Sequence, residues 1–258
     1  MPAIESETVG GATIAGRGGV ICGRGFFDLQ IEFAEAVSAL SGIPLARALL
    51  DYTNFYIRFG LGRDFDPSHA IWRQYVAGLE QAANRGEWSH RFYEARDPGM
   101  AAPGVVATFG CFSYARLPDD RIRLHFHNAE TDGQSPLARG RRDRRVADLT
   151  ALFTHVKRAA SRPVRVVGAS WLYNLDAYRG LFPAAYVATA RAARGRFRHM
   201  PLWGQFLDRH GEIRERVADQ FRQRLGRQSS LENLDWCFPL QVLSVESPVI
   251  PFYECYGI

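Results

Sequence analysis

Two histidines separated by one residue are the first side chains in this sequence that suggest chemistry. His125 and His127 lie in the segment RIRLHFHN. Alternate side chains of a β-strand point to the same face, so we expect both imidazoles to lie together. Imidazole serves in proton transfer, metal ligation or anion binding. A metal would need further ligands that the spacing does not identify, so we predict no metal and leave open a site role or a solvated strand face.

An arginine-rich run provides the second candidate. Arg139, Gly140, Arg141 and Arg142 directly precede a segment with helical periodicity, residues 143–160. The unpaired N–H groups of a helix N-terminus attract anions, and guanidinium groups add charge-assisted donors. The run therefore predicts an anion-binding loop, with a solvated helix start as the structural alternative.

Three further motifs fail their context. The tetrapeptide Arg209-His210-Gly211-Glu212 matches that of histidine phosphatases, but it comes too late in the chain for their sandwich fold, and we interpret it as chance. Ser170 in GASWL lacks the final glycine of a nucleophile elbow. The four cysteines form no C-x-x-C pair, which predicts reduced, mostly buried thiols.

The elements that would position these residues divide the chain into three parts. Of the 258 residues, 47% are hydrophobic and 23% charged, which is typical of globular proteins. Residues 1–25 are glycine-rich and predict a flexible leader, residues 26–97 predict a helical region, and residues 98–258 predict a mixed α/β domain. The fold class is therefore α+β or α/β, with helices first and a mixed sheet flanked by helices after them.

Within residues 98–258, strand and helix patterns alternate. Residues 105–117 and 121–128 predict an antiparallel hairpin turned at Pro118-Asp119-Asp120. A helix over 143–160, a buried strand over 164–172 and a short helix after it complete a β-α-β order, which favours a parallel pair. The rest predicts, in order, a strand from residue 183, a helix ending at Gly226, and terminal strands that Pro248 and Pro251 place at a sheet edge.

This order of elements over residues 105–185 resembles the GNAT-type N-acyltransferase superfamily. Ser170-Trp171-Leu172 is similar to a segment of GNAT-like proteins, and Asn174 and Tyr178 to residues of their late helix. The usual pyrophosphate loop, [QR]-x-x-G-x-[GA], is absent, and Arg139-Gly140 is its nearest counterpart.

The resemblance implies acyl-CoA as co-substrate. It implies that Ser170, Asn174 and the run Arg139, Gly140, Arg141 and Arg142 bind the cofactor. It also implies that His125 or His127 takes a proton from an amine or hydroxyl acceptor, and that Tyr178 protonates the leaving thiolate.

Whole-chain properties limit the partners. A net charge of +5 is too small to indicate nucleic acid, and no apolar run reaches the length of a membrane span. Without a signal-peptide pattern at the start, we expect a cytoplasmic bacterial protein with a small-molecule substrate, and leave a homodimer open. Two alternatives to the acyltransferase remain: a non-catalytic binding or regulatory protein on a similar scaffold, and a metal-dependent enzyme using His125 and His127.

Overall fold

The first part of the chain is helical, as predicted. The computed structural model describes residues 22–62, 64–96, 104–193 and 202–258. The helices are α1 (Arg24–Ser41), α2 (Leu45–Tyr52), α3 (Phe55–Arg58), α4 (Ala70–Gln81) and α5 (Arg85–Glu94). The leader predicted for residues 1–25 lies almost wholly outside the described residues, but Cys22 is buried and α1 begins at Arg24.

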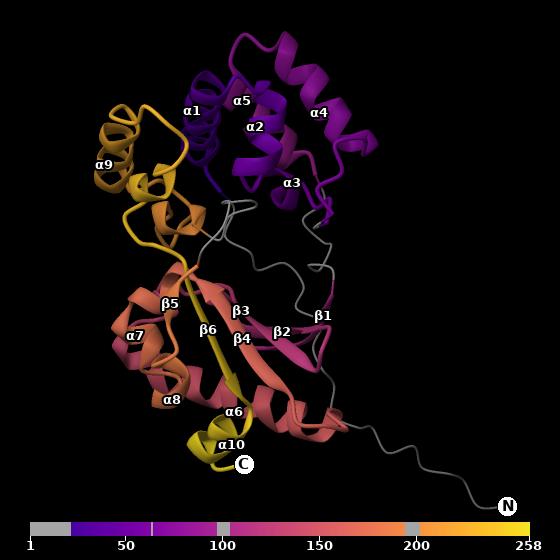
Figure 1. Cartoon of the computed structure of the whole chain (residues 1–258), viewed down its shortest axis with the longest axis vertical. Coiled ribbons are helices and arrows are strands. Elements are labelled where there is room, and N and C mark those ends of the chain that lie inside the picture. The colour runs from indigo at the N-terminus through magenta and orange to yellow at the C-terminus, as the bar shows by residue number, and fades with distance from the viewer. Residues whose placement is uncertain (1–21, 63, 97–103, 194–201) are drawn as a thin grey trace, which may run out of the picture.

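A six-stranded mixed sheet forms the second part (Figure 1). Its strands are β1 (Val105–Phe109), β2 (Phe112–Leu117), β3 (Arg121–Phe126), β4 (Arg165–Ser170), β5 (Arg191–Ala192) and β6 (Leu243–Pro248). Their spatial order is β1-β2-β3-β4-β6-β5, and only β3 and β4 run parallel. The fold is thus α+β, and the predicted β-α-β unit is present, with α6 (Arg142–Ala159) as its helix.

The segment expected as one strand over residues 105–117 is two strands. Gly110 has a φ of 53°, and the two-residue turn Gly110-Cys111 pairs Phe109 with Phe112. Glycine tolerates this left-handed backbone, which suits a tight hairpin turn. The next turn is where it was predicted, since Asp119 and Asp120 both have positive φ between β2 and β3.

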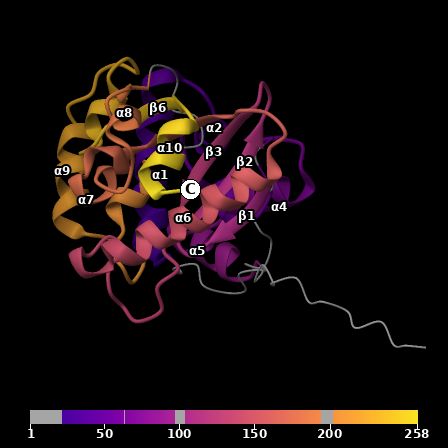
Figure 2. The ribbon, with the colours of Figure 1, turned by 90° about the horizontal axis from the view of Figure 1, so that it is seen from below.

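Helices cover one face of the sheet. Ile122, Val166 and Val245 point to this face and share a core with Leu149 and Leu152 of α6. The C-terminal helix α10 (Ile250–Tyr256) lies beside α6, as Figure 2 shows, and the rings of Phe153 and Phe252 stack 4.5 Å apart. Burial of this aliphatic and aromatic surface is the main term holding the sheet to its helices.

Two predictions for the last third were wrong. Residues 184–187 form a short helix, α8 (Ala184–Val187), rather than a strand, because Pro183 sits at its N-cap. The terminal segment is one strand and one helix, and β6 lies between β4 and β5 rather than at the edge. Pro248 is tolerated as the last residue of β6, and Pro251 lies in the first turn of α10, where its missing N–H costs nothing.

The segment from residue 202 to residue 242 returns to the helical part. Helix α9 (Glu215–Leu225), which ends at the predicted Gly226, and its neighbours share one core with α1. There Phe33 contacts Trp203, Phe221 and Phe238. Residues 98–258, expected as one α/β domain, are therefore divided by their packing between two cores.

No single helix among the described residues is long and apolar enough to cross a membrane. The pair α1 and α2 reaches the length only together, and it is bent by 117°.

Gly168 of β4 makes room for two tyrosine hydroxyls, which leads to a stability prediction. A Cβ at this position would meet the Tyr173 hydroxyl, and would lie 2.7 Å from that of Tyr186. We expect Gly168→Ala to lower the free energy of unfolding by about 1–3 kcal/mol, the usual cost of overpacking. Urea denaturation measures it, with Gly140→Ala as control because a Cβ there meets nothing within 4 Å. Equal stability of the two variants would contradict the prediction.

Candidate functional site

The two parallel strands at the centre of the sheet part midway along their length. Their register contains three pairs: Arg121 with Arg165, Ile122 with Val166, and Arg123 with Val167. Both strands continue for three more residues, β3 pairing with β2 and β4 with β6 throughout. The sheet is therefore continuous on either side of a gap at the carboxyl ends of β3 and β4.

Main-chain polar groups face this gap. The His127 N–H donates to the Cys111 carbonyl at 3.0 Å, so the peptide groups of His127 point toward β2. Because the N–H and C=O groups of successive strand residues point to alternate sides, those of Phe126 face β4. The Arg165 N–H donates to the Asp120 carbonyl at 2.9 Å, so by the same alternation those of Ala169 face β3. Beyond the last paired residues, these groups are available to a ligand lying between the strands.

A cleft of about 980 Å³ opens at the gap, between the sheet and the helical part that lies beyond the carboxyl ends of β3 and β4 (Figure 1). Both cores contribute to its walls. The sheet side supplies residues 124–128, 135–137, 169–173, 175 and 178, and the opposite side supplies residues 54, 58, 204, 207–210 and 214. A cavity of this size holds a large small-molecule ligand.

Both predicted histidines line this cleft. His125 is on β3, and His127 is the first residue beyond it. Burial, and then the positive charge of Arg145, lower the pKa of His127 below its usual value of 6.5, while Asp148 acts in the opposite direction. His127 is therefore a neutral imidazole at pH 7, the form that accepts a proton.

Tyr178 reaches the same cleft from the short helix α7 (Asp176–Arg179). Its ring lies 5.4 Å from that of Phe126 and is 2% exposed. Burial, and then the adjacent Tyr173 hydroxyl, raise the pKa of Tyr178 well above its usual value of 10.0. It is thus a protonated phenol at neutral pH, able to donate.

Ser170 and Asn174 have structural partners. The Ser170 hydroxyl caps the 3₁₀ turn η2 (Trp171–Asn174) by accepting the Leu172 N–H at 3.1 Å. The Asn174 amide donates to the carbonyls of Trp171 and Gln241, at 2.7 and 2.8 Å, and is not part of the cleft wall. Ser170 lines the cleft, so of the two only Ser170 is placed to meet a ligand.

The arginine run is placed differently from the prediction. Arg139, Gly140, Arg141 and Arg142 lie at the start of α6 but do not line the cleft. Arg141 pairs with Glu130, at 3.4 Å, and with Asp132, and Arg142 donates to the Gly180 carbonyl at 3.3 Å. Glu130 and Asp132 of the preceding loop therefore occupy the Arg141 guanidinium, one of those expected to receive an anion.

A buried ion network beneath this loop was not foreseen. Arg145 is 1% exposed, and its guanidinium lies 2.8 Å from Glu130 and 3.1 Å from Asp148. It also contacts the Cys111 thiol, whose pKa burial raises. The network joins the β1–β2 turn to the loop after His127. Helical spacing is the signal that could have found it, because Arg145 lies four residues before Leu149 on the apolar face of α6.

Three arginines of the opposite wall were also missed. Arg58 ends α3, and Arg209 and Arg214 lie in the loop before α9. The Arg58 guanidinium sits 5.4 Å from the centre of the Phe26 ring, and Arg214 donates to the Gln205 carbonyl at 3.4 Å. His210, from the phosphatase-like tetrapeptide, is exposed in the same loop and accepts from Arg209 at 2.9 Å.

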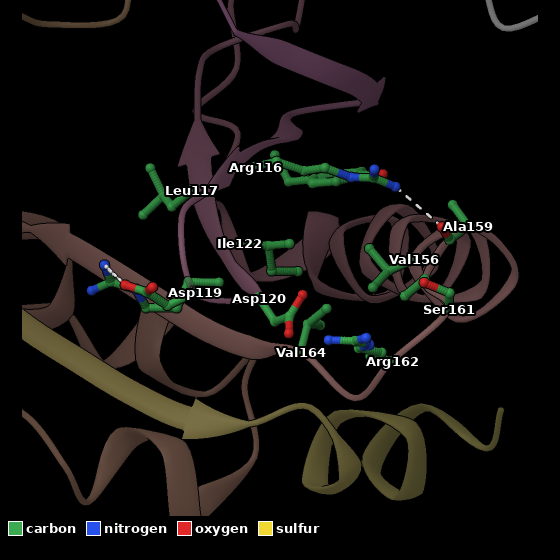
Figure 3. Close-up of a pocket in the computed structure, with 13 residues that line it drawn as sticks. Arg116, Leu117, Asp119, Asp120, Ile122, Val156, Ala159, Ser161, Arg162 and Val164 are labelled. Carbon is green, nitrogen blue, oxygen red and sulfur yellow. Dashed lines mark hydrogen bonds and ion pairs between the residues drawn. The ribbon is translucent and has the colours of Figure 1, made fainter.

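A second, smaller cavity marks the paired end of β3 and β4. It measures about 260 Å³ and lies between the turn at Asp119 and Asp120 and the end of α6 (Figure 3). Arg116 crosses it to donate to the Ala159 carbonyl at 3.1 Å. The two cavities share the strands but not the histidines, so the chemistry predicted from the sequence belongs to the larger cleft.

Cysteines and metal ligands add little to the cleft. Cys22, Cys111 and Cys237 are buried thiols outside any disulfide, as predicted, and Cys255 is exposed. Within the described part of the chain, no three His, Cys, Asp or Glu side chains are grouped as they would be around a metal ion.

Comparisons with known proteins find no relative of this chain, so its function is inferred from the geometry of the cleft. No family model matches the chain, and neither the curated proteins nor the solved structures contain a significant match to it.

Proposed function

We propose that the protein transfers an acyl group from an acyl-CoA thioester to an amine or hydroxyl of a small molecule or protein. One observation carries the proposal: two parallel strands part in mid-sheet beside a cleft lined by His125, His127 and Tyr178. The peptide groups of Phe126 and Ala169 could hydrogen-bond to an extended amide chain such as pantetheine. That chain would replace the pairing that β3 and β4 do not make with each other beyond Val167. The order of elements, similar to that of GNAT-type enzymes, supports the same reading.

The chemistry follows from the positions of these groups. The acceptor nitrogen or oxygen forms a bond to the thioester carbonyl carbon, and the carbon–sulfur bond breaks. His127, or His125 on the same wall, takes the acceptor's proton, and Tyr178 gives its phenolic proton to the leaving thiolate. Main-chain N–H groups in the gap stabilise the oxyanion of the tetrahedral intermediate. Solvent then returns the proton from the histidinium to the tyrosinate.

Calorimetry with acetyl-CoA and CoA tests the donor site. We expect both to bind. We expect Ser135→Glu to weaken binding by about fivefold, since a carboxylate about 4 Å from a CoA phosphate would cost about 1 kcal/mol in water. Ser135 is exposed at the cleft, and Ser161→Glu is the matched control because Ser161 is also exposed but lines the smaller cavity. Absence of binding at millimolar acetyl-CoA would reject the proposal.

A non-catalytic protein on this scaffold is the second candidate. The observation that favours it is the pairing of Arg141 with Glu130 and Asp132, which occupies a guanidinium expected to receive the pyrophosphate. Such a protein would retain CoA or acyl-CoA through purification, as mass spectrometry would detect. It would release no thiol from acetyl-CoA with any amine.

A further inference from the structure

The wall of the cleft that faces the histidines carries positive charge. Arg58, Arg209 and Arg214 line it, and among the described lining residues Asp208 is the single carboxylate. Asp208 is engaged with its own loop, because its Oδ1 accepts the main-chain N–H groups of His210 and Glu212, at 2.7 and 3.0 Å. None of the three arginines has a carboxylate within 4.0 Å in the described part of the chain.

Asn54 is an independent sign of a ligand at this wall. It is 7% exposed and lines the cleft one helical turn before Arg58. Its main-chain N–H donates to the buried Gln30 side chain at 3.0 Å, and its main-chain carbonyl accepts the Arg58 N–H at 2.9 Å. Yet the side-chain Oδ1 of Asn54 is buried without a hydrogen-bond donor among the described residues. A buried, unpaired amide oxygen costs free energy that a ligand N–H or O–H would recover.

We propose that Asn54, Arg58 and Arg214 bind an acyl acceptor that carries a carboxylate or phosphate. This inference rests on the proposed function, since it assigns the second substrate of the same cleft. Arg58 and Arg214 would hold the anionic group, because guanidinium pairs well with both oxyanions. Asn54 would accept a hydrogen bond from an N–H or O–H of the same molecule. The nucleophile of the acyl acceptor would then face His127 across the cleft. The thioester then enters from the side of residues 135–137 and the acceptor from the helical side.

Three small amines that differ in charge test the assignment by calorimetry. O-phosphoethanolamine carries a phosphate, β-alanine a carboxylate, and ethanolamine neither. We expect one or both anionic amines to bind at least about tenfold more tightly than ethanolamine, and Arg58→Gln to abolish that preference. Arg73→Gln is the matched control, because Arg73 is exposed on α4 and does not line the cleft. Tighter binding of O-phosphoethanolamine identifies phosphate as the recognised group, and tighter binding of β-alanine identifies carboxylate.

The outcomes separate this inference from the donor proposal. Equal binding of the three amines, or an unchanged preference in Arg58→Gln, overturns the acceptor assignment even where acetyl-CoA binds. A loss of acetyl-CoA binding in Arg58→Gln also overturns it, because it would assign Arg58 to the donor. Anion binding that depends on Arg58 in a protein that does not bind acetyl-CoA would support the anion site and reject acyl transfer.

Discussion

Replacing Tyr178 with phenylalanine is expected to lower kcat for acyl transfer by about 10²-fold or more, the usual contribution of a general acid. Burial and the Tyr173 hydroxyl keep the phenol protonated, and phenylalanine preserves its packing against Phe126 while removing the proton. Release of CoA, followed with a thiol reagent, measures the effect. The KM for acetyl-CoA is expected to change little, since the variant removes an interaction with the leaving group in the transition state.

Tyr186→Phe is the matched control for this prediction. The Tyr186 hydroxyl bonds that of Tyr173 at 2.8 Å and is equally buried, but Tyr186 does not line the cleft. Both variants lose one buried hydroxyl, so their stabilities should fall by a similar amount, about 1 kcal/mol. An acetyl thioester of a more acidic thiol should relieve the defect of Tyr178→Phe, because its thiolate leaves without a proton. Equal activity loss in the two variants, or a defect that does not depend on the thiol, would remove Tyr178 from the mechanism.

Substituting Arg145 by methionine is expected to lower the free energy of unfolding by about 3–5 kcal/mol, because Asp148 loses its guanidinium partner and Glu130 loses the most deeply buried of its three. Glu130 and Asp148 have side chains that are 4% and 15% exposed, and both lie within 3.1 Å of the Arg145 guanidinium. Burial already raises the pKa of Asp148, so its charge depends on this neighbour. Denaturant unfolding followed by circular dichroism measures the loss.

Arg144→Gln is the control on the same helix. Arg144 lies 3.0 Å from Glu130, but its side chain is 59% exposed, so we expect a loss of less than about 1 kcal/mol. The triple variant Glu130→Gln, Arg145→Met, Asp148→Asn should recover much of the stability lost by Arg145→Met, since it also removes the buried carboxylate charges. If Arg145→Met unfolds at the same denaturant concentration as Arg144→Gln, the buried network does not stabilise the loop after His127.

Elements with strong local patterns were predictable from the residues alone. The periodicity of residues 143–160 and the alternation of residues 121–126 gave α6 and β3, and their order gave the parallel partner β4. The prediction failed where one residue decided the structure, as at Gly110, whose positive φ makes two strands of one apolar segment. It also failed for β6, because a proline at the end of a strand removes no ladder bond and does not require an edge position.

The chain's local patterns thus established the helical first part, the β-α-β unit and the two histidines as candidates for chemistry. Folding alone placed Asn54, Arg58 and Arg214 on the wall of the cleft that also contains His127. The reason is that periodicity reports on neighbours a few residues apart. The cleft brings together side chains from α3, β3 and the loop before α9, which only the packing of two separate cores places face to face.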